Sequence, residues 1–240
     1  MLFRSQKLLK DLLALVHYAM AQQDIRYYLN GLLLVLDGSK IKVVATDGHR
    51  LSYAEASFEG KADKREVILP RKAVLELAKQ LTSADDTISI DIFAAQVRFR
   101  YGNSELVTKI IDGKFPDYTR VIPVNYNKTI TLDRQVLLQS LQRAAILSNE
   151  KYRGVRWTLT KGSLKVSCSN TEQEEAQEEI EVGYDADALD LGFNITYLMD
   201  VLNNVHVESI DCSFGDASSS MLITLPGRDD FRYVVMPMRI

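Results

Sequence analysis

The sequence predicts an α+β fold built from two tandem modules, each with antiparallel sheet and two helices. Three observations predict it: four segments have helical apolar spacing, the segments between them are short and rich in Val, Ile, Thr and Tyr, and two stretches match at a constant offset of 123 residues. Short strands joined by turn dipeptides, with few helices among them, are typical of antiparallel sheet and not of βαβ units.

The first predicted helix has an apolar stripe with i, i+3, i+4, i+7 spacing. The stripe consists of Leu9, Leu12, Leu13, Val16 and Met20. Pro70 opens the second helix, PRKAVLELAKQL, where proline is favoured in the first turn. Asp133 and Asn194 are suited to cap the third and fourth helices, DRQVLLQSLQRAAIL and NITYLMDVLNNV.

The predicted strands lie between these helices and are separated by the turn dipeptides DG, KG, GN and PG. In chain order they are GLLLVLDGSKIKVVAT, DTISIDIF, QVRFRYG, ELVTKII, VRWTLTKGSLKVSCS, SIDCSF, SMLITLP and YVVMP. LDGSK and TKGSLK each predict a hairpin turn.

The internal match indicates a duplicated module. YYLNGLLLVLDGSKIKVVATD aligns with KYRGVRWTLTKGSLKVSCSNT, so that Gly31 corresponds to Gly154 and Asp47 to Asn170. Two unrelated domains would not keep one offset across turns and helices. We expect one module over residues 1–124 and a second over 125–240, with the boundary in VIPVNYN.

The composition is that of a soluble globular protein, with 46% hydrophobic and 25% charged residues. The longest apolar run near the start, LLALV, is far shorter than the roughly 20 residues of a membrane-spanning helix, and the N-terminal residues lack a signal-peptide pattern. The two cysteines, Cys168 and Cys212, fit buried thiols in a reducing compartment. We therefore expect a cytoplasmic protein.

Charge is divided unevenly between the halves. Residues 1–124 carry a net charge of +3 and residues 125–240 a net charge of −6, with nine acids and no base in 172–190. A globally basic nucleic-acid binder is excluded, although one basic face is not. We interpret the acidic run as the solvated edge of a sheet, because charge at an edge opposes aggregation. The functional alternative is a wall that repels phosphate on the side away from the ligand.

Known catalytic and metal-binding patterns are missing from the sequence. None of His17, His49 and His206 has a histidine partner at i+4, and neither CxxC nor a Gly-rich phosphate loop occurs. We expect no cofactor and no metal site. A hydrolase using Asp47 and His49 is the enzymatic alternative, but a plain turn at Asp47-Gly48 is the favoured interpretation.

Two segments have an unusual apolar character for a surface. The C-terminal run YVVMPMRI places Met236 and Met238 on either side of Pro237, which cannot donate a hydrogen bond to a sheet. Flexible thioethers adapt to several ligands, so this tail is suited to line a groove. Tyr27 and Tyr28 are adjacent, and on a strand one of them must face outward.

Basic residues recur on the predicted helices of both halves. They are Lys7, Lys10, Arg71, Lys72, Lys79, Arg134 and Arg143. Scattered bases on helices are usually just solvated. If the two repeats lie side by side, these bases form one positively charged track.

Several motifs together resemble the bacterial β sliding clamp, the processivity subunit of the replicative DNA polymerase. They are QQDIRYYLNG, VATDGHRLS, VILPRKAVLEL, DGKFPDY, RAAILSNEKYRGVR, GFNITYLMDVLN and YVVMPMRI. The resemblance extends from about Lys7 to Ile240 and covers the second and third of the family's three modules. It implies a non-enzymatic protein with helices lining a DNA hole and sheets forming an outer wall.

The resemblance also implies a peptide-binding groove between the two modules, with a deep subsite and a second subsite. The deep subsite would consist of Leu29, Thr46, Gly48, His49, Arg50, Leu51, Pro116, Val121, Val234 and Met236. The second subsite would consist of Tyr27, Tyr28, Gly31, Asn194, Tyr197, Ser220, Pro237, Met238 and Arg239. Gln22 stands where the family often has His, and Ser218 where an apolar residue is expected, so the shallow end should be more polar.

For DNA, the resemblance adds Gln23 and Tyr28, in a loop similar to the family's DNA-touching loop, and supports Arg71 and Lys72 at the start of a hole-lining helix. The implied partners are duplex DNA, a clamp-loader subunit, replicative and translesion polymerases, and mismatch-repair and ligase-type proteins. Self-association is also implied, because the family forms rings.

The missing first module leads to a second functional hypothesis. Only MLFRS precedes the first helix, so we expect the opening strand of the middle-type module to be clipped. Because the family's ring interface joins the first module of one subunit to the third of another, a two-module chain could act as a regulatory decoy. Such a decoy would bind clamp partners without encircling DNA.

Overall fold

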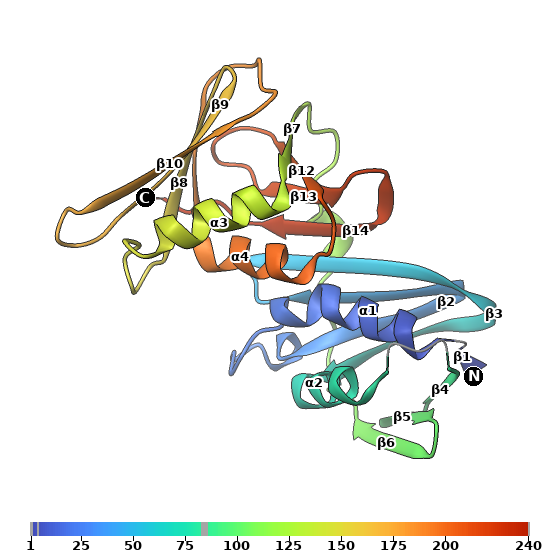
Figure 1. Cartoon of the computed structure of the whole chain (residues 1–240). Helices are drawn as coiled ribbons and strands as arrows, with labels where there is room; N and C mark the ends of the chain where they lie inside the picture. Colours follow the sequence, from blue (N-terminus) through green and yellow to red (C-terminus); the bar gives the residue numbers. More distant parts are fainter. Residues whose placement is uncertain (1, 4, 83–85, 240) are drawn as a thin grey trace. The chain divides into compact units, whose positions relative to one another are not determined.

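The structure, a computed structural model, describes residues 2–3, 5–82 and 86–239 (Figure 1). It divides into two compact units, Met1–Tyr118 and Thr119–Ile240, called the first and second unit below. The division lies six residues before the boundary expected from the sequence. A 3-10 turn, Tyr118–Arg120, carries the chain across it.

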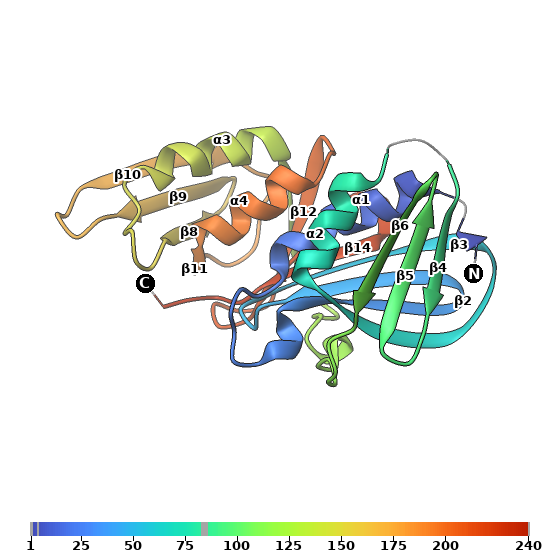
Figure 2. The same cartoon turned by 90° about the horizontal axis from the view of Figure 1, so that it is seen from below.

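Among its described residues, the first unit combines two helices with two sets of antiparallel strands. Its elements are β1 (Leu2–Phe3), α1 (Gln6–Val16), 3-10 turns at His17–Ala19 and Tyr27–Leu29, β2 (Gly31–Thr46), β3 (Arg50–Pro70), α2 (Arg71–Gln80), β4 (Ile88–Ile92), β5 (Gln96–Tyr101) and β6 (Ser104–Lys109). One sheet has the order β1-β4-β5-β6, and β2 pairs with β3. The two helices lie side by side, and both contact β2 and β3 (Figure 2).

The second unit repeats this plan with more, shorter strands. Its elements are β7 (Lys128–Asp133), α3 (Arg134–Ala145), β8 (Gly154–Thr160), β9 (Ser163–Ser169), β10 (Glu175–Glu181), β11 (Leu189–Asn194), α4 (Ile195–Asn204), β12 (Ser209–Phe214), β13 (Met221–Leu225) and β14 (Arg228–Val235). The strands form two antiparallel groups, β10-β9-β8-β11 and β14-β13-β12-β7. The predicted α+β class with antiparallel sheet is confirmed.

The helix starts follow the predicted capping, with one correction. The side chains of Asp133 and Asn194 accept backbone N–H bonds from the first turns of α3 and α4, as predicted. The prediction for Pro70 is wrong by one residue, because Pro70 is still extended (φ −60°, ψ 142°) and ends β3 opposite Gly31. The helix therefore begins at Arg71, whose backbone N–H donates to the Asn30 carbonyl at 3.1 Å.

The duplicated segment forms strands over corresponding residue ranges in the two units. β2 spans residues 31–46, and β8 together with β9 spans 154–169, the same interval displaced by 123 residues. The predicted turn in TKGSLK is confirmed, since Thr160 pairs with Ser163 and Gly162 has φ +76°. The predicted hairpin turn in LDGSK is wrong, because residues 31–46 form one continuous strand, β2, that pairs with β3 on both sides of Gly38. Gly38, with a left-handed φ of +58°, instead marks an irregularity at which the register of β2 against β3 shifts.

The apolar stripe of α1 and the strands beneath it form the core of the first unit. Leu9, Leu12, Leu13 and Val16 are all buried, as their spacing predicts. Met20, predicted as the last residue of this helical stripe, is also buried but lies beyond the helix, which ends at Val16 and is followed by a 3-10 turn. In the second unit Trp157 on β8 packs edge-to-face against Phe193 on β11, with ring centroids 5.8 Å apart, a favoured aromatic geometry. Strand β10 lies at a sheet edge, and its Glu175, Glu179 and Glu181 are exposed, which fits the edge interpretation for this part of the acidic run.

Gly31 is required by close packing. An added Cβ would collide with the Leu69 carbonyl oxygen and lie 2.9 Å from Cδ1 of Ile111. Gly31→Ala should therefore lower the free energy of unfolding by about 1–3 kcal/mol, the usual cost of overpacking, as measured by urea denaturation. Gly183→Ala is the matched control, because a Cβ there meets no atom within 4 Å among the described residues. Equal stability of the two variants would contradict this packing argument.

Candidate peptide-binding and DNA-binding surfaces

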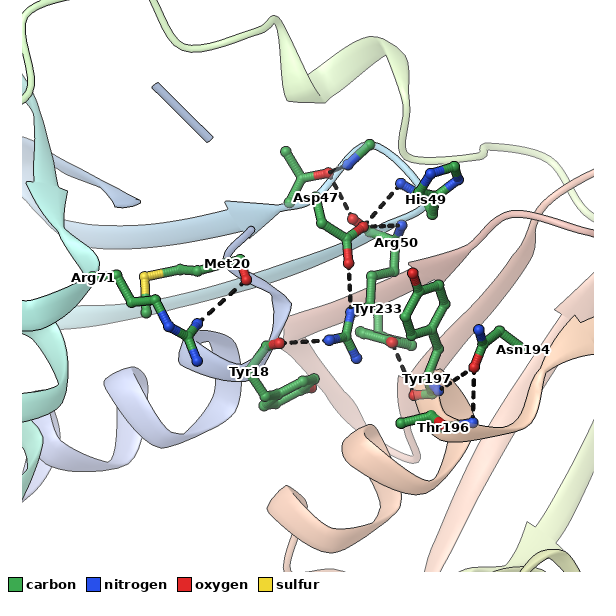
Figure 3. Close-up of polar contacts among 12 residues, drawn as sticks. Tyr18, Met20, Asp47, His49, Arg50, Arg71, Asn194, Thr196, Tyr197 and Tyr233 are labelled. Atoms are coloured by element: carbon green, nitrogen blue, oxygen red, sulfur yellow. Dashed lines mark hydrogen bonds and ion pairs between the residues drawn. The ribbon is translucent and has the colours of Figure 1, made fainter. Parts of the chain in front are cut away.

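In the first unit the turn between β2 and β3 is held by one carboxylate. Asp47 Oδ1 accepts the backbone N–H groups of His49 (2.9 Å) and Arg50 (3.0 Å), and Oδ2 accepts Arg50 Nε at 3.0 Å (Figure 3). Arg50 Nη2 also donates to the Tyr18 carbonyl at 2.7 Å. The turn therefore has a fixed shape and is tied to the 3-10 turn His17–Ala19 that follows α1.

Thr46 and Gly48 complete this turn. The Thr46 hydroxyl donates to the Arg50 carbonyl at 2.6 Å and accepts the Gly48 N–H at 3.1 Å. Gly48 has φ +91°, a conformation that side chains other than glycine rarely adopt. Five predicted deep-subsite residues, Thr46, Gly48, His49, Arg50 and Leu51, thus belong to one ordered turn.

This geometry favours the turn over the acid/base couple of Asp47 and His49. The bond between them runs from the His49 backbone N–H, so it does not orient the imidazole. Both Asp47 carboxylate oxygens accept bonds from the turn itself and from Arg50.

A second ion pair, which the sequence did not indicate, anchors the loop that carries Gln23 and Tyr28. The Arg26 guanidinium binds both Asp24 oxygens (3.0 and 2.7 Å) and donates to the Asp47 carbonyl at 3.1 Å. The Arg26 hydrogen bonds lower the pKa of Asp24 to about 2, so this pair stays charged down to acidic pH. The loop is thereby fastened to the Thr46–Leu51 turn. The sequence offers only a weak signal for this ion pair, namely an acid and a base two residues apart.

The remaining first-unit candidates differ in exposure. Tyr27 is exposed and packs edge-to-face against the half-buried Tyr28, so one tyrosine faces outward as predicted. The strand assumed for them is wrong, because both lie in the 3-10 turn Tyr27–Leu29. Pro116 is exposed. Leu29, Leu51 and Gly31 are buried. These three residues are therefore part of the packing beneath the predicted peptide-binding surface and not of its exposed face.

In the second unit the tail leaves the sheet at Met236. Val234 and Val235 are buried at the end of β14, as predicted for a last core strand, whereas Met236 is 41% exposed. The tail remains attached further along, because the Met238 N–H donates to the Gly192 carbonyl on β11 at 2.8 Å. The tail therefore runs in a fixed course with its thioethers accessible.

The other second-unit candidates also have structural bonds. Asn194 caps α4, and the Tyr197 carbonyl accepts the Tyr233 hydroxyl at 2.9 Å (Figure 3). Ser220 Oγ lies 3.7 Å from the Met236 sulfur. Val121, Pro237 and Met238 are half-buried, and Arg239 is exposed.

The serine-rich loop explains one departure from the family pattern. Asp216 accepts hydroxyl bonds from Ser218 (2.8 Å) and Ser219 (2.7 Å), and these bonds, with that from the Ser218 backbone, lower its pKa to about 2. Ser218 thus holds the loop together, a role that an apolar residue cannot fill.

All three predicted DNA-binding arginines form hydrogen bonds within the protein. Arg134 donates to the Leu202 and Val207 carbonyls at 3.0 Å each, at the end of α4. Arg143 forms a two-pronged pair with Glu178 (2.8 and 2.6 Å), which raises the Arg143 pKa. Arg71 donates to the Met20 carbonyl at 3.3 Å, and burial lowers its pKa.

The predicted DNA-binding lysines are different. Lys7 on α1 and Lys72 and Lys79 on α2 are exposed, and Lys10 is half-buried. Since α1 and α2 are neighbours, these lysines share one pair of helices in the first unit. Gln23 is exposed with φ +56°, at the loop anchored by Arg26.

Within residues 2–3, 5–82 and 86–239, no group of three or more His, Cys, Asp or Glu side chains is arranged to hold a metal ion. Over the same residues, every helix is too short or too polar to span a bilayer.

Two family descriptions match adjoining parts of the chain. "DNA polymerase III beta subunit, central domain" matches residues 4–117, and "DNA polymerase III beta subunit, C-terminal domain" matches residues 119–239. The chain belongs to the DNA polymerase III beta subunit family. The two matched ranges meet where the structure divides into its two units.

Individual relatives agree with this assignment. The beta sliding clamp of Pseudomonas putida is 46% identical over 236 residues, and that of Escherichia coli is 40% identical over 235. Both alignments cover 98% of this chain and 64% of the relative, so the chain spans under two thirds of its relatives' length. The solved Pseudomonas aeruginosa DNA polymerase III subunit beta superposes with a TM-score of 0.97 at 44% identity, covering 100% of this chain and 66% of that one. The family resemblance seen in the sequence is confirmed.

The Asp47 carboxylate should be the main stabilising group of its turn. The side chains of Asp47 and Arg50 are only 16% and 9% exposed. Asp47→Ala removes hydrogen bonds to a charged partner and should lower the free energy of unfolding by about 2 kcal/mol, as measured by urea denaturation. Asp185→Ala breaks a fully solvated pair with Lys161 and serves as the control with little expected change. An Asp47→Ala protein as stable as the control would show that the turn does not depend on this carboxylate.

Proposed function

We propose that this chain acts as a non-enzymatic sliding clamp or clamp fragment, which tethers a DNA polymerase and other clamp-binding proteins to DNA. The match of the whole chain to the central and C-terminal domains of the family carries this proposal. The TM-score of 0.97 to a solved clamp supports it. The two buried cysteines support a reducing, cytoplasmic location.

We further propose that two segments bind the hydrophobic peptide motif of clamp partners. One is the Thr46–Leu51 turn of the first unit, and the other is the Met236–Arg239 tail of the second. The turn supplies polar groups in fixed positions, and the tail supplies adaptable thioethers beside Ser220. A few fixed polar groups with apolar surface are what recognition of an extended peptide requires.

A relative offers a chemical probe of this surface. The Pseudomonas aeruginosa sliding clamp has been solved bound to griselimycin. If the proposed function is right, this chain should bind griselimycin as well, and bound griselimycin can then be tested for competition with a clamp-binding peptide.

Met236 should be an energetic anchor for the peptide. A short synthetic peptide with an adjacent Leu–Phe pair should bind with a dissociation constant of about 1 μM, or about −8 kcal/mol. Met236→Ala should weaken binding by about 1–2 kcal/mol in calorimetry, as loss of an interface anchor does. Val136→Ala removes an apolar side chain of similar exposure, 46% against 41% for Met236, outside the proposed site and is the control. Unchanged affinity of the Met236→Ala protein would refute the assignment.

We propose that the lysines of α1 and α2, with Gln23 and Tyr28, contact duplex DNA. Binding to a linear duplex should be weak and fall steeply with salt, because it rests on counterion release from a few phosphate contacts. Lys72→Ala should reduce the salt slope by about one contact, as measured by fluorescence anisotropy. Lys61→Ala, also exposed but on β3, should leave it unchanged. Tight, salt-independent binding to linear duplex would contradict this mode.

The regulatory decoy makes the same peptide prediction but differs in what happens on circular DNA. A clamp is retained on closed circular DNA and released when the circle is cut, whereas a decoy is not retained on either. We expect a monomer or a weak oligomer at physiological salt, and sedimentation at micromolar concentration measures it. The proposed partners include the clamp-loader subunit, replicative and translesion polymerases, and mismatch-repair and ligase-type proteins.

A further inference from the structure

The second unit has a pocket of about 630 Å³ that lies outside the residues assigned above, apart from the tail. Four segments enclose it: the loop with Asn149 and Tyr152, the start of β8, the end of β9 with the start of β10, and the tail residues Met238 and Arg239. Figures 1 and 2 show the C-terminal end of the chain beside β8.

The floor of the pocket is the outward face of the β8–β9 pair. Arg156 on β8 lies opposite Ser167 on β9, and both point away from the core, since the alternate residues Val155 and Trp157 are buried. On its other side Arg156 is paired with Gly192 of β11, which has no side chain. The sheet surface beside Arg156 therefore stays open, and the tail crosses there through the Met238–Gly192 hydrogen bond.

The wall opposite the tail is a loop with its own internal bonds. Asn149 Oδ1 accepts the backbone N–H groups of Lys151 and Tyr152 at 3.0 Å each, and the Asn149 carbonyl accepts that of Arg153 at 2.8 Å. These bonds present the Tyr152 ring, which is 57% exposed, with the Lys151 ammonium 5.2 Å from its centroid. The wall is ordered before any ligand arrives, which reduces the entropic cost of binding.

The charges of the pocket define what it can accept. Two guanidinium groups, Arg156 and Arg239, line it, against one carboxylate, Glu175. Arg156 lies 3.6 Å from Asp190, but both side chains are about half exposed, so the pair is loose. Planar guanidinium groups favour carboxylates as partners. With two guanidinium groups against one carboxylate in its lining, the pocket suits a single acidic side chain.

We propose that this pocket binds the residues that flank the hydrophobic pair of a clamp-binding peptide and selects an acidic side chain at that position. Met238 and Arg239 belong both to the pocket and to the proposed peptide-binding tail, so a peptide on the tail is led to the pocket. The inference rests on the proposed function and adds a specificity determinant to it.

The test compares peptides of one core sequence. The core carries the Leu–Phe pair, and it is extended at one end or the other by a glycine linker followed by Glu, or by Gln as the neutral control. Calorimetry at low salt should show that one of the two Glu extensions raises affinity about threefold, the scale of a solvated charge pair. The Gln extensions should not, and the gain should disappear at high salt.

Three protein variants assign the gain to the pocket. Arg156→Gln should remove it, and Asp190→Asn should increase it, because a competing carboxylate is lost. Arg228→Gln breaks a similar surface pair, with Asp230, outside the pocket and should leave the gain unchanged. All three variants should bind the unextended core peptide like the parent protein.

The outcomes separate the two proposals. If the core peptide does not bind, the proposed function fails. If the core peptide binds but neither Glu extension gains affinity, or if the gain survives Arg156→Gln, the pocket inference is overturned while the proposed function stands.

Discussion

The Asp47 carboxylate is the interaction on which the first unit's candidate surface depends. It fixes the path of the chain between β2 and β3 and holds the Arg50 guanidinium, which in turn binds the 3-10 turn after α1 through the Tyr18 carbonyl. Arg26, which anchors the neighbouring loop, donates a hydrogen bond to the backbone carbonyl of Asp47. The proposed peptide contacts and the proposed DNA-touching loop thus share one support, and a change at Asp47 reaches both.

In the second unit an asparagine holds the turn that corresponds to the Asp47 turn. At the offset of 123 residues Asp47 is replaced by Asn170, whose Oδ1 accepts the backbone N–H groups of Glu172 and Glu174 at 3.0 Å. Its amide then donates to the Glu174 carboxylate at 2.6 Å. A carboxylate serves where the partner is Arg50, and an amide serves where the partner is an acid, since only the amide can donate. The duplicated turn has kept the bond to the backbone N–H two residues on, but its second backbone bond goes to the fourth residue instead of the third, and the side chain that accepts both has lost its charge.

The sequence predicted those features that depend on neighbouring residues. The α1 stripe, the caps at Asp133 and Asn194 and the turn at Gly162 follow from spacing and from single-residue preferences, and they are confirmed. The start of α2 was misplaced because the pairing of Pro70 with Gly31 extends β3 by one residue, which local preference does not reveal. The roles of Arg26 and Arg134 were missed for a similar reason. Their acceptors at Asp47 and Leu202 lie 21 and 68 residues away in the chain.

The arginines and the lysines of the predicted DNA-binding set have different structural roles, which sequence position alone does not show. Arg71, Arg134 and Arg143 direct their rigid guanidinium forks at carbonyls or a carboxylate within the protein, where several donors on one plane are needed. Lys7, Lys72 and Lys79 remain exposed on flexible stems. A mobile ammonium is a point charge that any phosphate satisfies equally well. Contacts of this kind carry no sequence information and release readily, which suits the sequence-independent DNA contact proposed for these lysines. The arginines therefore shape the proposed DNA-binding helices and their supports, and the lysines supply the charge.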